Sequence, residues 1–182
     1  RSTLFPYTTL FRSGSWYQGV LPEVAGGVFI ADGVRVIGNV ALRKGANIWF
    51  NSVLRGDIAP IEVGQFTNVQ DNVTVHVMSH EPTIIGDYVT VGHGAVIHCS
   101  KVGNNCLIGM GAVLLGYVEI GENCVIGAGT LLTQHRKIPS NSMVYGNPAR
   151  IVRTLRPDEI EAVHQSAMDY YDIAQKYLRN NE

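Results

Sequence analysis

The sequence predicts an all-β protein, a parallel β-helix of six-residue repeats followed by one C-terminal α-helix. Aliphatic residues recur every six positions, glycine often follows them directly, and the 20 glycines of this 182-residue chain recur instead of clustering. A period of six is neither helical nor a simple alternation, and it indicates short strands separated by tight turns. Because one hexad cannot bury its apolar side alone, we expect the hexads to coil and stack into a solenoid.

The repeats supply the predicted core at two inward-facing positions. Each hexad has a large aliphatic anchor, and the residue four places later is usually small or β-branched, so both are expected to fill the narrow interior. Glycine directly after an anchor is expected to give the backbone its freedom at the corners. The anchors are Ile30, Val36, Leu42, Ile48, Leu54, Val63, Val69, Val75, Ile85, Val91, Ile97, Val102, Ile108, Leu114, Ile120, Ile126 and Leu132.

The hexad pattern ends before the C-terminus. Asn147-Pro148 closes a turn-rich segment, and Pro157-Asp158-Glu159 is typical of a helix start. We therefore assign residues 14–155 to the β-helix and residues 156–182 to a helix that packs along it. Residues 1–13 carry neither hexads nor a signal-peptide pattern and resemble a translated adapter sequence, so we interpret them as a foreign or disordered leader.

The composition excludes several classes of function. The net charge is −1 and there is no basic run, which argues against nucleic acid and anionic membranes as partners. No apolar stretch approaches the roughly 18 residues that span a bilayer. The three cysteines form no CxxC pair, which suits a reducing compartment, so we expect a cytoplasmic protein. Cys106 and Cys124 are expected to stack as small core residues on adjacent coils.

Three of the six histidines fall where the repeat brings them near one another. His76 and His98 each follow an anchor of the same face on successive coils, so they are expected to lie about 4.8 Å apart along the axis. His93 stands two residues after an anchor of another face and cannot easily reach this pair in its own chain. The remaining histidines are interpreted as surface or turn residues: His80, His135 and His164.

A three-fold trimer would complete the site. In a closed head-to-tail ring, the face with His76 and His98 meets the face with His93 of the next subunit. Three imidazoles then converge and leave a fourth position open, as is expected of a catalytic metal centre. One coil lower, the same contact sets Arg55 opposite Asp71, which is either part of the site or only a salt bridge that holds the trimer together.

Several motifs around these residues are similar to those of the γ-class carbonic anhydrases. The resemblance covers roughly residues 16 to 155. It implies a left-handed β-helix with three hexads per coil, as in the hexapeptide-repeat family. The motifs are Asn51-Ser52-Val53-Leu54-Arg55-Gly56-Asp57, Thr67-Asn68-Val69-Gln70-Asp71-Asn72, His76, Val91-Gly92-His93-Gly94, Ile97-His98 and Gly146-Asn147-Pro148-Ala149.

The resemblance also implies a reaction. His76 and His98 of one subunit and His93 of its neighbour in a homotrimer would hold Zn²⁺, or alternatively Fe²⁺ or Co²⁺, and the enzyme would reversibly hydrate CO₂ to bicarbonate. Gln70 matches a residue that contacts the reacting solvent or orients CO₂, and Asn68 matches a nearby pocket residue. The other residues that match the site or the subunit contact of the family are Arg55, Asp57, Asp71 and Tyr145.

The sequence departs from the best-studied archaeal form, and other functions stay open. That form has a long acidic loop and a second glutamate after the RGD motif, whereas the insertion here is only residues 81–84 and position 58 is isoleucine. The carboxylates that would remove the proton rapidly are therefore absent here, although His80 or Glu81 could substitute for them. The alternatives are an acyltransferase or thioesterase for coenzyme A esters, and a metal-binding trimer without turnover. Three imidazoles suit several metals, so the sequence does not select one.

Overall fold

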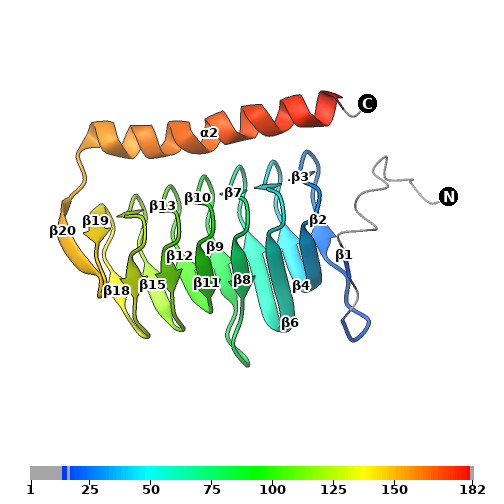
Figure 1. Cartoon of the computed structure of the whole chain (residues 1–182), viewed down its shortest axis with the longest axis horizontal. Helices are drawn as coiled ribbons and strands as arrows, with labels where there is room; N and C mark the ends of the chain where they lie inside the picture. The colour runs from blue at the N-terminus through cyan, green and yellow to red at the C-terminus, as the bar shows by residue number, and fades with distance from the viewer. Residues whose placement is uncertain (1–13, 16, 181–182) are drawn as a thin grey trace.

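The chain folds into a parallel β-solenoid with one long helix beside it (Figure 1). The computed structural model describes residues 14–15 and 17–180, so the predicted leader, residues 1–13, lies outside the described residues. The solenoid has about seven turns. Its strands pair in parallel, except at the C-terminal end, where the last two strands pair antiparallel. The predicted fold class is confirmed.

The solenoid has three faces, here named a, b and c in the order in which the chain visits them. Faces a and b form one 12-stranded sheet because β4 (Arg35–Leu42) and β6 (Val53–Val63) run around the corner between them. Face c is a separate 8-stranded sheet. Face a also contains β1 (Gly14–Ser15), β8 (Thr74–His76), β11 (Val96–His98), β14 (Val113–Leu114) and β17 (Leu131–Leu132). Face b also contains β2 (Glu23–Val24), β9 (Thr83–Ile85), β12 (Ser100–Val102), β15 (Val118–Ile120) and β18 (Lys137–Ile138). Face c contains β3 (Phe29–Ile30), β5 (Asn47–Ile48), β7 (Asn68–Val69), β10 (Thr90–Val91), β13 (Leu107–Ile108), β16 (Val125–Ile126), β19 (Ser142–Tyr145) and β20 (Arg150–Thr154).

The core lies inside the solenoid at the two predicted positions. Anchors such as Leu54 and Ile97 are fully buried, and so is the small residue Ala95 at the second position. Apolar burial stabilises by roughly 25 cal/mol per Å², so these continuous rows of aliphatic side chains are a main source of stability. Cys106 and Cys124 stack on adjacent coils as predicted, and the Cys124 N–H donates to Cys106 Sγ at 3.4 Å.

The glycines that follow the anchors have a different role from the predicted one. A Cβ on Gly103 would lie 2.7 Å from the carbonyl carbon of Gly121 on the next coil, so glycine is required there by close coil stacking. The left-handed backbone at the corners belongs largely to other residues, such as Asn105 with φ 54° and Asn123 with φ 55°. Asparagine tolerates this conformation better than most side chains. The predicted corner role is confirmed for other glycines, such as Gly94 with φ 67° and Gly111 with φ 65°, and it was wrong for the glycines that follow the anchors.

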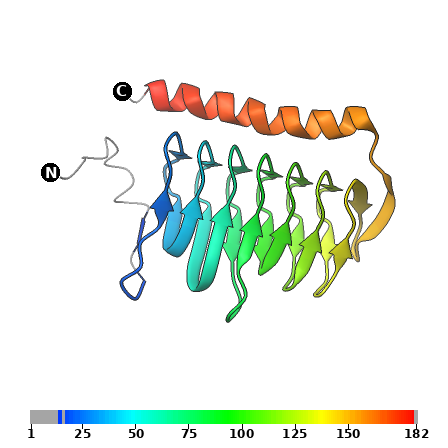
Figure 2. The ribbon, with the colours of Figure 1, turned by 180° about the vertical axis from the view of Figure 1, so that it is seen from behind.

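Helix α2 (Pro157–Asn180) lies along the solenoid and returns toward its N-terminal end (Figures 1 and 2). It contacts β3, β5, β7 and β10 of face c. Trp49 lies under the helix, with the rings of Tyr170 and Tyr177 edge-on to it at centroid distances of 5.5 Å. The predicted C-terminal helix is thus present. Among the residues that the structure describes, no helix combines the length and the apolar character needed to cross a bilayer.

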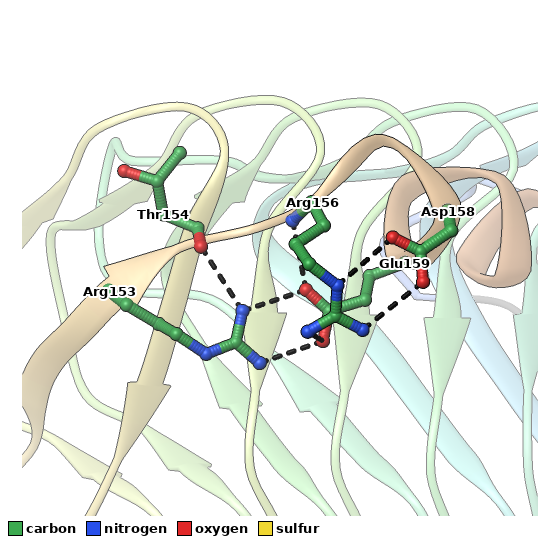
Figure 3. A network of polar contacts seen from close by, with 5 residues as sticks. All are labelled: Arg153, Thr154, Arg156, Asp158 and Glu159. Atoms are coloured by element: carbon green, nitrogen blue, oxygen red, sulfur yellow. Dashed lines mark hydrogen bonds and ion pairs between the residues drawn. The ribbon is translucent and has the colours of Figure 1, made fainter.

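Charged groups fix the start of this helix (Figure 3). Glu159 accepts two hydrogen bonds of 2.7 Å from the Arg153 guanidinium and one of 2.9 Å from the Arg156 backbone N–H. These bonds, first that from Arg153 and then that from Arg156, lower the pKa of Glu159 to about 2. The Arg156 guanidinium donates twice to Asp158. Both carboxylates lie in the first helical turn, where negative charge is favourable.

Candidate metal centre

Two predicted metal ligands lie side by side on face a. Strands β8 and β11 pair in register, with His76 directly opposite His98, and the two ring centroids are 5.3 Å apart. Each histidine ends its strand and follows a fully buried anchor, so the alternation of a strand turns both side chains outward. One chain therefore presents two of the three predicted ligands on a single surface.

Asp57 and Arg55 lie one coil below this pair. Asp57 Oδ1 is 3.0 Å from His76 Nε2, and Asp57 Oδ2 accepts a hydrogen bond from Arg55. Burial opposes ionisation of the Asp57 carboxyl, but the hydrogen bonds with His76 and Arg55 outweigh it, so the pKa of Asp57 lies below its usual value. Burial, together with the charges of His76 and Arg55, also lowers the pKa of His98. This favours the neutral imidazole that a metal ion requires.

His93 lies just after β10 of face c, where two contacts fix it. Its backbone N–H donates to Gln70 Oε1 at 3.2 Å, and its Nδ1 is 2.7 Å from Asp71 Oδ2. A carboxylate only accepts hydrogen bonds, so in the neutral ring Nδ1 carries the proton and Nε2 keeps a free lone pair. The neutral imidazole of His93 is therefore the tautomer that can bind a metal through Nε2.

A buried row of polar side chains supports His93. Gln70 is 4% exposed and donates to Asn68 Oδ1 at 3.2 Å. Asn68 is fully buried and donates in turn to Thr90 Oγ1 at 2.9 Å. Since buried polar groups are costly unless they are paired, these bonds hold the Gln70 amide in one orientation. The bond from His93 to Gln70 is thus made to a fixed acceptor.

Helix α2 reaches this side of the site through Tyr170. The Tyr170 ring packs edge-on against Trp49. Burial and the negative charge of Asp71 raise the pKa of Tyr170. Trp49 and Gln70 each follow one of two paired anchors, so they occupy the same outward row on adjacent coils. The packing of α2 on Trp49 therefore supports the row to which Gln70 belongs.

The predicted site residues fall into two groups within one chain. The group on face a is Arg55, Asp57, His76 and His98. The group on face c is Asn68, Gln70, Asp71 and His93. In the part of the chain that the structure describes, no three His, Cys, Asp or Glu side chains are arranged to hold a metal ion. The predicted pairing of Arg55 with Asp71 across subunits stays a prediction, because in one chain Arg55 contacts Asp57 and Asp71 contacts His93.

Tyr145 lies apart from both groups. The paired anchors of face c place it three coils beyond His93, roughly 14 Å along the axis. Its ring packs over Gly127, and 47% of the residue is exposed. The structure of one chain does not bring Tyr145 to the candidate ligands, so its role in the site stays a prediction.

Sequence reasoning missed the groups that hold the main chain of the two stacked histidines. Thr83 Oγ1 donates to the His76 carbonyl at 2.6 Å, and Ser100 Oγ donates to the His98 carbonyl at 3.4 Å. It also missed the contact of Asp57 with His76, because residues 57–60 lie where the period of six is broken. Ile58 in this stretch is 49% exposed and, with Asp57, borders a pocket of about 280 Å³.

Comparisons with known proteins agree with the fold. A sequence profile described as "Bacterial transferase hexapeptide (six repeats)" matches residues 99–134. The chain is 44% identical over 161 residues to a carbonic anhydrase of Geobacillus kaustophilus, covering 88% of each protein. It is 44% identical over 166 residues to the mitochondrial gamma carbonic anhydrase 2 of Arabidopsis thaliana. The chain belongs to the γ-class carbonic anhydrase family. The alignment with the Arabidopsis relative covers 88% of this chain and only 60% of that protein.

A solved structure of similar shape is described by another activity. A Bacillus cereus protein described as a putative acetyltransferase superposes with a TM-score of 0.89 at 38% identity, covering 91% of this chain and 96% of that one. The same solenoid therefore occurs in proteins described by different activities, and the function has to be inferred from the side chains of the site. Membership of the γ-class carbonic anhydrase family confirms the resemblance that the motifs indicated.

Proposed function

We propose that this γ-class carbonic anhydrase homologue reversibly hydrates CO₂ to bicarbonate at a metal centre shared by neighbouring subunits of a homotrimer. His76 and His98 of one subunit would hold the ion together with His93 of the next. The observation that supports this most is the state of His93. Its Nδ1 is engaged by Asp71 and its backbone by Gln70, which leaves Nε2 as the ligand atom on a different face from the stacked pair.

The outward side chains of faces a and b favour the trimer. The outward row of face b is mostly charged and forms ion pairs, with Ile84 as an exposed exception, whereas that of face a is largely aliphatic and partly exposed. An aliphatic row on an outer surface favours a protein partner, and a second copy of this chain would bring its His93 to the row. The charged residues of face b include Arg43, Glu62, Lys101, Glu119 and Lys137. The aliphatic residues of face a are Val53, Val96, Val113, Leu115 and Leu131.

The donor set fits a divalent metal ion, and each neighbouring side chain has a defined task. A metal ion bound there would lower the pKa of its water toward 7 and so supply a nucleophile at neutral pH. Asp71 keeps the proton of His93 at Nδ1, and Asp57 holds His76. The Gln70 amide has a second N–H, which would orient CO₂ beside the ligands. Three imidazoles suit Zn²⁺, and Fe²⁺ and Co²⁺ are the alternatives.

Stopped-flow CO₂ hydration tests the proposal, on protein purified without oxygen and loaded separately with Zn²⁺ and with Fe²⁺. We expect hydration well above the buffer rate, lost in His93→Ala. The matched control is His164→Ala. His164 belongs to α2, and its ring packs on Tyr88, away from the candidate ligands. Wild-type protein with a full complement of metal and no hydration would contradict the proposal.

A second candidate function is acyl transfer or hydrolysis of coenzyme A esters. It is favoured by the Bacillus cereus structure, which is described as a putative acetyltransferase. Acetyl coenzyme A, offered to the same metal-loaded and metal-free preparations, separates the two functions. A metal-binding trimer without turnover would leave both substrates unchanged. The predicted cytoplasmic location stays a prediction, since the name of the Arabidopsis relative gives the mitochondrion for that protein.

A further inference from the structure

The main chain of His76 is held by two donors. β8 ends at His76, and the chain makes a short turn closed by Met78 and Glu81 before β9 begins at Thr83. The His76 carbonyl accepts the Thr83 hydroxyl at 2.6 Å and the Cys99 backbone N–H at 3.0 Å. A carbonyl oxygen has two lone pairs, so both are used. The position at which His76 leaves the sheet is therefore doubly fixed.

A weaker contact of the same kind occurs one coil further on at His98. Ser100 begins β12, two residues after His98, and its single hydroxyl proton is shared between the His98 carbonyl at 3.4 Å and the Leu115 carbonyl at 3.3 Å. Thr83 and Ser100 are both buried, with 0% and 1% of each residue exposed. Each of the two stacked histidines thus has a buried hydroxyl group on its own carbonyl.

Thr83 and Ser100 belong to one inward-facing row of residues that runs along the solenoid, and the flanking residues of this row are aliphatic. On adjacent coils the row reads Val40, Ile61, Thr83, Ser100 and Val118. Its aliphatic members are also no more than 1% exposed. An aliphatic side chain is therefore compatible with this position, and a buried hydroxyl group costs free energy unless it is bonded. Hydroxyl groups stand in the two coils that carry the stacked histidines, and aliphatic groups stand in the flanking coils.

We propose that Thr83 and Ser100 are positioning residues, whose buried hydroxyl groups fix the main chain of the metal ligands His76 and His98. This rests on the proposed metal centre but not on turnover with CO₂. The Cα–Cβ bond of a ligand sets the direction of its side chain, so the two bonds on the His76 carbonyl limit the tilt of that imidazole, and the shared bond from Ser100 does so more weakly at His98. Partners that hydrogen-bond the side chain of a metal ligand typically contribute about 10- to 100-fold in metal affinity, and a bond to the main chain acts less directly. Because Cys99 would still hold the His76 carbonyl, we expect Thr83→Val to lie near the lower end, about 10-fold.

The test compares Thr83→Val with Thr83→Ser and with Thr67→Val. Thr67 is the matched control, because it is fully buried and its hydroxyl also donates at 2.6 Å, to the Gly86 carbonyl at a corner without candidate ligands. The full-length variants are titrated with Co²⁺ against a chromophoric chelator, and the visible absorption spectrum of bound Co²⁺ is recorded. Thermal melting of the metal-free proteins measures stability separately.

We expect Thr83→Val to bind Co²⁺ about 10-fold more weakly, with a changed cobalt spectrum, and Thr83→Ser to restore both. Thr67→Val should lose stability but keep the wild-type affinity and spectrum. Wild-type affinity in Thr83→Val, or equal losses in Thr83→Val and Thr83→Ser, would overturn the proposal. If Thr83→Val does not fold, Ser100→Ala carries the test, with an expected loss of a few-fold, and wild-type affinity there overturns it. Because affinity is read without turnover, a wild type that binds Co²⁺ but does not hydrate CO₂ contradicts the proposed function alone.

Discussion

Replacing Asp71 by asparagine should weaken metal binding by disturbing His93 without touching the stacked histidines. Asparagine keeps the shape of aspartate but offers an N–H as well as an oxygen. When that N–H donates to Nδ1, the ring proton moves to Nε2, and the nitrogen that would bind the metal is blocked. The substitution therefore changes which tautomer of His93 is favoured, while it leaves the fold of the solenoid intact.

The size of the effect follows from the contact between His93 and Asp71. The distance from Nδ1 to Oδ2 is 2.7 Å, which is typical of a charge-assisted hydrogen bond. The two side chains are 41% and 30% exposed, so water screens the interaction and reduces its contribution. Carboxylate partners of metal-binding histidines contribute about 10- to 100-fold in affinity. We expect the lower end for Asp71→Asn, about 10-fold or roughly 1.4 kcal/mol.

The assay is competition for Zn²⁺ with a chelator of known affinity. Asp87→Asn is the matched control, because Asp87 accepts the Gln65 backbone N–H at a similar distance of 2.7 Å but at a corner without candidate ligands. We expect Asp87→Asn to bind Zn²⁺ like the wild type. Affinity within about twofold of wild type in Asp71→Asn, or an equal loss in Asp87→Asn, would refute the tautomer argument.

Other predictions concern the helix start, the core and the outer faces. Glu159 has a folded pKa of about 2, below its ordinary value of 4.5, so its contribution to stability is present above about pH 4.5 and is lost as the pH falls toward 2. Glu159→Gln should therefore lower the melting temperature at pH 7 but not at pH 2, and an equal difference at both values contradicts this. The three cysteines are all buried, so a thiol reagent should label none in the native protein and all three after denaturation; rapid labelling of the native protein would contradict the structure. Val113→Lys on face a should reduce the trimer to smaller species in light scattering at micromolar concentration, whereas Lys101→Glu on face b should not, and an intact trimer in both would argue against face a as the interface.

The sequence predicts the fold well because the period of six fixes both the burial and the register of each residue. Once Val75 and Ile97 are assigned as anchors of the same face, the positions of His76 and His98 follow by counting. The structure pairs them as the count requires. The split of the site residues between two faces follows from the same count.

Some features could not be predicted because they lie where the period of six breaks. Others could not be predicted because two structural roles favour the same kind of residue. The chain leaves the hexad pattern at residues 57–60, so the contact of Asp57 with His76 depends on a path that no repeat specifies. The second insertion was predicted at residues 81–84, but Thr83 and Ile84 belong to β9, so it lies at residues 77–82. Thr83 occupies a core position that is equally compatible with an aliphatic residue, as Ile61 shows one coil earlier. The glycines after the anchors were misinterpreted because close stacking and corner freedom favour the same residue type.

The most direct test of the shared metal centre is complementation between two inactive variants. His93→Ala keeps the stacked pair, and His98→Ala keeps His93, so neither homotrimer has a complete site. When the two variants are denatured, mixed in equal amounts and refolded together, about one quarter of the subunit contacts should join an intact pair to an intact His93. We predict recovery of about one quarter of the wild-type zinc content and CO₂ hydration. A mixture that performs no better than the average of the two separate variants would contradict a site shared between subunits.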